Sequence, residues 1–120
     1  MPHYIDGFLL PIAKDQIENY RAISSQAAAV WREHGALDYR ECVGEALEPM
    51  EGLASFPVVA GAKEGETVIF AYIVYESRAH RDEVNAKVMA DPRMKCGEPD
   101  SMPFDCRRMA YGGFQTIVGD

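Results

Sequence analysis

Hydrophobic and polar positions alternate along several stretches of the chain, a period typical of β-strands. The expected strands are residues 4–11, 36–44, 56–62, 67–76 and 107–118. Pro11 would end the first of them, because proline cannot donate a hydrogen bond to a neighbouring strand. The third and fourth, separated by a short segment containing Gly65, predict a β-hairpin. The paired glycines at 112 and 113 indicate a bulge or a close approach of other atoms in the last strand.

Two other segments place apolar residues three and four positions apart, which predicts amphipathic helices at residues 14–34 and 77–94. Gly35 is a suitable left-handed C-cap for the first, and Ser77 is a suitable N-cap for the second. The Asp91–Pro92 pair should limit the second helix and allow one short extra turn. Residues 45–55 are acidic and contain Pro and Gly, and residues 95–103 also contain Gly and Pro, so we expect loops in both segments.

The order of these elements favours two βαβ halves that share one sheet. The fold class predicted for residues 1–120, as a single domain, is α+β: a ferredoxin-like antiparallel sheet with both helices on one face. Both faces of the strand at 67–76 are apolar, since Val68, Phe70, Tyr72 and Val74 alternate with Ile69, Ala71, Ile73 and Tyr75. Two helices cover one face, so a second copy of the sheet is the simplest cover for the other, and we expect a homodimer. The alternative is a local cover by a loop or the last strand.

Composition excludes several classes of partner. The chain has 120 residues, is 48% hydrophobic and carries a net charge of −7, so neither nucleic acid nor an anionic membrane surface is an expected partner. No apolar run approaches the roughly 20 residues that span a bilayer, and the N-terminus lacks the pattern of a signal peptide. We therefore expect a cytoplasmic protein. The three cysteines and three histidines show no ligand spacing, so no metal and no bound cofactor are predicted.

Arg81 lies close to the apolar stripe of the second helix, about 20° from Val88 on a helical wheel. A buried guanidinium needs an anionic partner, and Asp105, Glu76, Glu41 and Asp6 are the candidates. We favour Asp105, which precedes the last strand. The hypothesis is a structural clamp in which Pro103 restricts the backbone, Phe104 fills an apolar gap and Asp105 receives Arg81, with Arg108 nearby to keep Asp105 ionised. An arginine that binds an anion or a substrate is the alternative.

Glu41 interrupts an apolar strand face between Tyr39 and Val43. Left without a partner there, it would be a candidate general base, whereas a bonded Glu at a subunit interface would give the same pattern. Cys42 should point to the opposite face. Cys106 has two arginines beside it, which can activate a thiol, but no histidine is placed to act as its base. We interpret Cys106 as an inert cysteine.

Four blocks, YIDGF at 4–8, RDEVNAKVMADPRM at 81–94, MPFD at 102–105 and RRMAYGGF at 107–114, resemble the signatures of the YbaA-like family of small uncharacterised bacterial proteins. That family is similar in fold to the dimeric α+β barrels, which include cofactor-independent monooxygenases, other small-molecule enzymes and stress-associated proteins. The resemblance implies a fold and a dimer, and it transfers no catalytic residue. The residues that match the signature are Asp6, Arg81, Asn85, Asp91, Pro92, Arg93, Met102, Pro103, Phe104, Asp105, Arg108, Tyr111 and Gly112.

Two functional hypotheses follow. In the first, each subunit binds a planar or carboxylated metabolite between sheet and helices, and either only binds it or oxidises it as a cofactor-independent monooxygenase would. The residues expected to line that pocket are Asp6, Glu41, Tyr72, Arg81, Asn85 and Tyr111. In the second, the protein is a non-catalytic, stress-associated dimer whose polar residues are structural. An unpaired Arg81 and Asn85 in a pocket would favour the first hypothesis, and a closed core with both bonded would favour the second.

Overall fold

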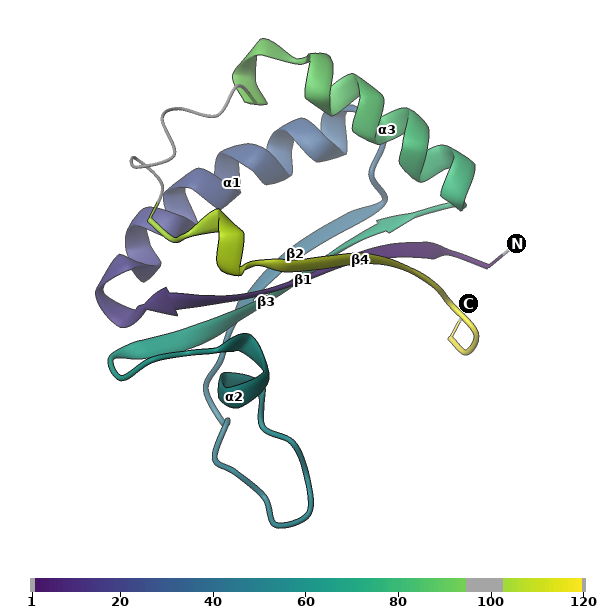
Figure 1. The fold of residues 1–120 in the computed structure, drawn as a ribbon. Coiled ribbons are helices and arrows are strands. Elements are labelled where there is room, and N and C mark those ends of the chain that lie inside the picture. Colours follow the sequence, from purple (N-terminus) through teal and green to yellow (C-terminus); the bar gives the residue numbers. More distant parts are fainter. Residues whose placement is uncertain (1, 95–102, 120) are drawn as a thin grey trace.

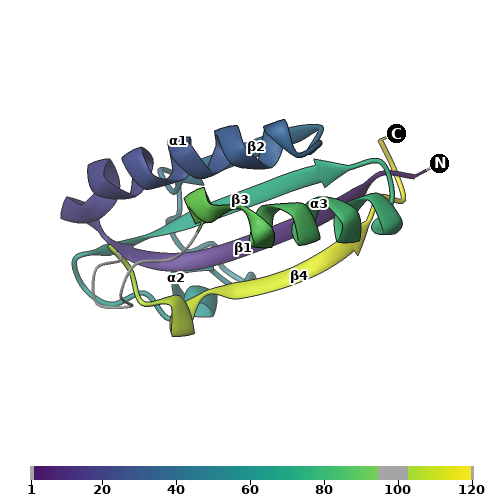
Figure 2. The same cartoon turned by 90° about the horizontal axis from the view of Figure 1, so that it is seen from above.

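The computed structural model describes residues 2–94 and 103–119. Four strands form one antiparallel sheet in the order β2-β3-β1-β4, and their bounds are β1 Tyr4–Ala13, β2 Asp38–Val43, β3 Glu66–Tyr75 and β4 Ala110–Gln115. Helices α1 (Ile17–Glu33) and α3 (Arg78–Ala90) lie on the same face of that sheet (Figures 1 and 2). The predicted ferredoxin-like α+β fold is confirmed.

The signals at the helix ends act as the sequence predicts. A single 3₁₀ turn, η1 (Lys14–Gln16), leads into α1, and Gly35 follows the helix with φ of 116°. The Ser77 side chain accepts a hydrogen bond from the backbone N–H of His80, 3.1 Å away, and so caps α3. After Asp91 the chain makes the expected extra turn, η2 (Pro92–Met94).

The core lies between the sheet and the two helices. Ile69, Ala71, Ile73 and Tyr75 on β3 are buried there. One cluster joins Val30 and Trp31 of α1 to Val84 and Val88 of α3, over Ile73 and Tyr75. A second cluster gathers Leu10, Ile12 and Tyr20 with Ile69 and Ala71, and Phe104 and Met109 pack against it. The spacing that predicted the helices is therefore the spacing of their buried contacts.

The prediction of a hairpin at 56–62 and 67–76 was wrong in its first arm. Residues Phe56–Ala60 form a short helix, α2, with Pro57 in its first turn and Gly61 in the left-handed conformation at its end (φ 71°). Proline has no N–H to donate and therefore fits the first turn of a helix, where that donor has no partner. The apolar run FPVVA is too short to show a helical period, and this explains the error. The part of the chain that is described thus has four strands, where the patterns indicated five.

Two strand ends also differ from the predictions. β1 continues through Pro11 to Ala13, because β4 pairs with β1 only from Tyr4 to Leu9. At Pro11 the strand has β3 on one side and no partner strand on the other, so no ladder hydrogen bond is lost. The last strand begins at Ala110, since Cys106–Arg108 form a 3₁₀ turn, η4.

The face of the sheet opposite α1 and α3 is only partly covered. The loop at 45–55 carries no helix or strand, as predicted, and it lies with α2 on this side of the sheet (Figure 1). Val68 is buried, but Phe70 is 47% exposed and Phe114 is 61% exposed. The register places Phe70, Leu9 and Ala110 in one row across this face. We call it the open face.

Candidate functional site

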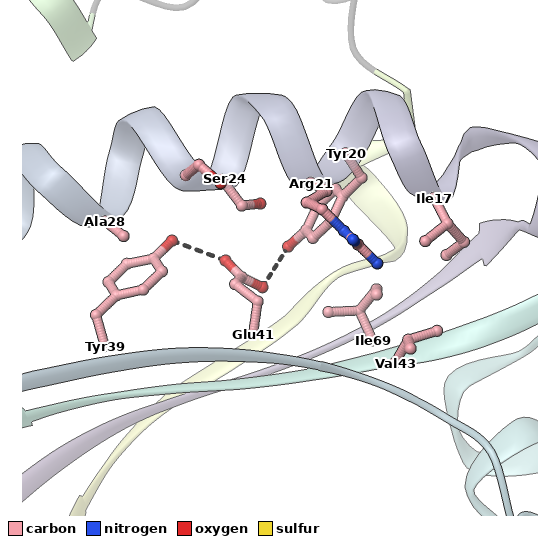
Figure 3. Close-up of a pocket in the computed structure, with 10 residues that line it drawn as sticks. Ile17, Tyr20, Arg21, Ser24, Ala28, Tyr39, Glu41, Val43 and Ile69 are labelled. Carbon is pink, nitrogen blue, oxygen red and sulfur yellow. Dashed lines mark hydrogen bonds between the residues drawn. The ribbon is translucent and has the colours of Figure 1, made fainter.

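A cavity of about 240 Å³ lies between α1 and the sheet, above β2 (Figure 3). Residues one helical turn apart on α1 form its upper wall, and alternate residues of β2, with one residue of β3, form its floor. Its lining residues are Ile17, Tyr20, Arg21, Ser24, Ser25, Ala28, Tyr39, Glu41, Val43 and Ile69. Because the apolar side chains gather toward one end, the cavity has an apolar part and a polar part.

Glu41 is the centre of the polar part. The Tyr20 hydroxyl donates a hydrogen bond to Oε1 of Glu41 and the Tyr39 hydroxyl donates one to Oε2, each 2.7 Å long. Figure 3 shows the carboxylate held between the two phenol rings, one from α1 and one from its own strand. Glu41 is therefore bonded, and the condition under which it was a candidate general base, an unpartnered carboxylate, is not met.

Both phenols keep their protons at neutral pH. Burial raises the pKa of Tyr20, and the charge and hydrogen bond of Glu41 raise it further, while a hydrogen bond with Ser24 acts in the opposite direction. Burial and Glu41 raise the pKa of Tyr39 in the same way. The negative charge of this trio consequently rests on Glu41, and the tyrosines act as fixed neutral donors.

Two of the roughly four lone-pair positions of the Glu41 carboxylate are occupied by the tyrosines. Among the described residues no cation forms an ion pair with it, since Arg21, the one cationic residue that lines the cavity, pairs with Glu18 at 3.5 Å and has a side chain that is 67% exposed. A fixed carboxylate beside an apolar wall can bind a small molecule that carries a hydrogen-bond donor and a hydrocarbon body.

The six residues predicted to line one pocket do not lie together. Glu41 belongs to the cavity below α1, and Tyr72 lies on the open face, in a ring contact with Phe70 (6.2 Å between centroids). The other four, Asp6, Arg81, Asn85 and Tyr111, form a separate cluster below α3. The prediction of a single pocket was wrong because the sequence pattern cannot show whether a residue lies under α1 or under α3.

The cluster below α3 is centred on Asp6, which is 1% exposed. Its carboxylate accepts hydrogen bonds from Arg81 Nη1 at 2.9 Å, from the Tyr111 hydroxyl at 3.1 Å and from the Tyr75 hydroxyl at 3.1 Å. The Tyr75 hydroxyl also lies 3.4 Å from Asn85 Oδ1, so its single hydrogen is shared between Asp6 and Asn85. Burial acts to lower the pKa of Arg81, but the facing carboxylates raise it more, so the net shift is upward and the ion pair persists.

Arg81 is also held from two further sides. Its Nε donates to Asp82 Oδ1 at 2.8 Å, and its guanidinium lies 5.0 Å from the centre of the Tyr4 ring. With these contacts Arg81 is bonded within the protein, and Asn85 contacts Tyr75. This is the arrangement that favours a structural role for the cluster.

The predicted Arg81–Asp105 clamp is wrong, because Arg81 pairs with Asp6. Asp105 is exposed and instead accepts hydrogen bonds from the backbone N–H and the Nε of Arg107, at 2.9 and 3.1 Å, which lower its pKa. Asp105 caps η4 locally, whereas Asp6 points from the centre of the sheet toward α3. The sequence offered four candidate carboxylates for Arg81, and the register of the sheet, which places Asp6 below α3, decided among them.

The remaining parts of that hypothesis are placed as follows. Phe104 packs edge-on against Tyr20, with 5.5 Å between ring centres, and so fills an apolar gap as expected. Pro103 is half-buried beside it, and Met102 lies outside the described residues. Arg108 binds Glu66 through both terminal nitrogens, at 2.8 and 2.7 Å, and donates to the Gly61 carbonyl at 2.7 Å. Arg108 therefore ties η4 to the start of β3.

Sequence reasoning missed Tyr20 and Tyr39 as polar residues of the site. Tyr39 had been placed beside Glu41 on an apolar strand face, and Tyr20 falls within the predicted first helix, but neither was assigned a polar role. A tyrosine near a carboxylate on a buried face was the available signal, since a buried phenol needs a hydrogen-bond partner. Cys42 is exposed, as is Cys106, and neither lines the cavity of Figure 3.

Within residues 2–94 and 103–119, no three residues of His, Cys, Asp and Glu gather where they could hold a metal ion. In the same ranges, none of the helices has the length and apolar character needed to cross a membrane.

Comparison with known proteins gives consistent results. The profile of a family described as "Protein of unknown function (DUF1428)" matches residues 3–106. The chain is 42% identical over 118 residues to the uncharacterized protein YbaA of Escherichia coli (strain K12), covering 98% of both chains, and it is equally similar to YbaA of Shigella flexneri. Among solved structures, an uncharacterized NIPSNAP domain protein from Burkholderia xenovorans superposes with a TM-score of 0.56 at 9% identity, over 98% of this chain and 99% of that one. The last similarity concerns the fold alone.

Proposed function

The chain belongs to the DUF1428 family of proteins of unknown function, and on this premise we propose that it binds a small organic molecule in the cavity between α1 and β2. One observation supports the proposal above all others. The Glu41 carboxylate is fixed by two tyrosines and faces a cavity with an apolar wall, and no cation of the described residues neutralises it.

The structural alternative for this trio is a bonded carboxylate inside a filled core. A cavity of about 240 Å³ beside the carboxylate weighs against it, because such a cavity leaves room for a ligand next to Glu41, which a filled core would not. The Asp6 cluster provides the contrast within the same protein. There the carboxylate accepts from three donors, one of which is the cationic Arg81, and Asp6 is 1% exposed.

Filling the cavity tests the proposal. Ala28 lines it, and Ala29, the next residue of α1, is exposed. A fragment library is screened by chemical shift changes in ¹H–¹⁵N spectra of the unaltered protein, and hits should shift the amides around the cavity. Ala28→Phe should abolish those shifts, while Ala29→Phe should retain them, and circular dichroism checks that both variants fold. Hits that bind equally well to the Ala28→Phe protein, or a library that yields no hit at this cavity, would contradict the proposal.

We further propose that the protein acts as a cytoplasmic homodimer, assembled through the open face. The support is the apolar character of that face, on which two grooves of about 250 and 270 Å³ flank Phe56 and Phe70. Exposed aromatic rings in such a patch are typical of interfaces between chains. The cytoplasmic location is supported by the acidic composition and by cysteines without a disulfide pattern.

Light scattering at micromolar concentration tests the dimer. The unaltered protein should have about twice the chain mass of 13.3 kDa. Phe70→Glu would place a charge in the interface and should give a monomer. Met89→Glu is the matched control, since Met89 is 72% exposed but lies on α3, away from the open face. A monomeric unaltered protein, a dimer that survives Phe70→Glu, or a dimer that Met89→Glu disrupts equally would refute this assembly.

A further inference from the structure

We infer that the ligand of the cavity between α1 and β2 carries a protonated amine, which binds Glu41, and a compact hydrocarbon body. The inference rests on the proposed function and adds the chemical class of the ligand. Three features of the cavity carry it: the charge on its floor, the donors around that charge and the apolar wall beside it.

The charge comes first. The two groups that bind Glu41 are neutral phenols, and neither removes its negative charge. In the described part of the chain, Asp6 and Asp91 have side chains that are 1% and 9% exposed, and each has an arginine within 3 Å, at 2.9 and 2.7 Å. Burial makes an uncompensated charge costly, so a half-buried carboxylate without a cation favours a ligand that supplies one.

The donors decide which cation fits. The two tyrosines occupy one position on each carboxylate oxygen and leave one acceptor position on each. An ammonium group has several N–H donors and no acceptor, so it can donate to a free position on Glu41. A ligand carboxylate would instead place its negative charge beside that of Glu41.

The wall sets the size of the hydrocarbon part. Ile17, Val43 and Ile69 lie together at one end of the cavity, away from Tyr39 (Figure 3). Typical cavities for drug-sized ligands have volumes of roughly 300 Å³ or more, and this one has about 240 Å³. A single ring or a short branched chain is therefore the body that fits.

Arg21 offers the competing interpretation, an anion held by its guanidinium. Its side chain comes from α1, is 67% exposed and already has Glu18 as a partner at 3.5 Å. An exposed arginine attracts an anion weakly, because water screens the interaction. The less solvated charge belongs to Glu41, which is half-buried, whereas Arg21 is exposed.

Three probes that share one ring test the inference on the unaltered protein: benzylamine, benzyl alcohol and benzoate. Titrations followed by ¹H–¹⁵N spectra at pH 7 should show benzylamine shifting the amides around the cavity, with an affinity at least about tenfold higher than that of the alcohol, as expected for a charge-assisted hydrogen bond. Benzoate should not bind there. This comparison needs no variant and therefore does not depend on how a variant folds.

Two variants then test whether Glu41 supplies the negative charge that binds the amine. Glu41→Gln keeps one oxygen that accepts from one tyrosine, and its NH2 group can donate to the hydroxyl oxygen of the other. The variant removes the charge and should weaken benzylamine binding by about tenfold or more. Glu45→Gln removes the same charge from an exposed residue just beyond β2 and should leave the binding unchanged. Equal affinity for amine and alcohol, or equal effects of the two variants, would overturn the assignment of the amine.

The other outcomes separate this inference from the proposed function. Tighter binding of benzoate at the cavity would overturn the amine and identify Arg21 as the recognition residue, with the binding site intact. Library hits at the cavity without any benzylamine binding would also overturn the amine alone. A cavity that binds none of the probes and no member of the library would overturn both proposals.

Discussion

Removing one partner of the ion pair between Asp6 and Arg81 should strongly destabilise this protein, because it leaves a buried charge without its counter-charge. Both side chains are shielded from water, with Asp6 1% exposed and Arg81 13% exposed. Arg81→Met removes the cationic donor of Asp6 and leaves two phenols to bind a buried charge. Removing one partner of a buried pair typically lowers the free energy of unfolding by about 3 to 5 kcal/mol. Because two donors remain on Asp6, we expect a loss of about 3 kcal/mol for Arg81→Met.

Asp6→Asn should cost less, about 2 to 3 kcal/mol, because Asp82 still binds Arg81 through Nε. If the two residues act as a pair, the double variant should be at least about 1 kcal/mol more stable than the sum of the single effects predicts. The control is Asp82→Asn, which removes the other carboxylate on the same arginine. Its side chain is 62% exposed, and the expected loss is below about 1 kcal/mol.

Urea unfolding, followed by circular dichroism at one fixed protein concentration, measures these free energies. The fixed concentration matters because, in the proposed dimer, stability would depend on it. The reasoning is refuted if Arg81→Met costs no more than Asp82→Asn, or if the single effects add within about 0.5 kcal/mol. Either result would mean that water or the tyrosines compensate for the lost cation.

Two further predictions concern the last strand and its anchor. A Cβ on Gly113 would lie 2.8 Å from the Tyr4 ring, whereas one on Gly112 would be 3.7 Å from its nearest neighbour. Thermal unfolding should therefore show that Gly113→Ala lowers the free energy of unfolding by about 1 to 3 kcal/mol and that Gly112→Ala changes it little. Equal effects of the two variants would exclude the close approach. Hydrogen bonds from Arg108 lower the pKa of Glu66 to about 2 from 4.5, so the charged form is favoured in the folded state. Its contribution is complete above about pH 4.5 and disappears as pH falls toward 2. Glu66→Gln should accordingly destabilise the protein at pH 7 by about 1 kcal/mol. Urea unfolding between pH 7 and pH 2.5 should show the difference in stability between the unaltered protein and the variant shrinking. A difference that stays constant over this range would contradict the pairing.

The sequence determined the directions of the side chains. A period of two places Tyr39, Glu41 and Val43 on one face of β2, and a helical period places Tyr20, Ser24 and Ala28 on one side of α1, so these residues could be assigned to their faces before any partner was known. The apolar residues on both sides of β3 likewise indicated a second apolar face, which is the open face where Phe70 lies. Such patterns are local, because the backbone of each element repeats with a fixed period.

Tertiary structure alone decided which side chains meet. Asp6 and Arg81 are 75 positions apart, Tyr20 and Glu41 are 21 apart, and no local period relates them. The register of β1 against β3 and β4 places Asp6 under α3 beside Tyr111, whereas Asp105 turns back to Arg107 in η4. The division of the polar residues between two helices, with an arginine over one carboxylate and a cavity over the other, likewise arises from packing, because it depends on how α1 and α3 sit on the same sheet.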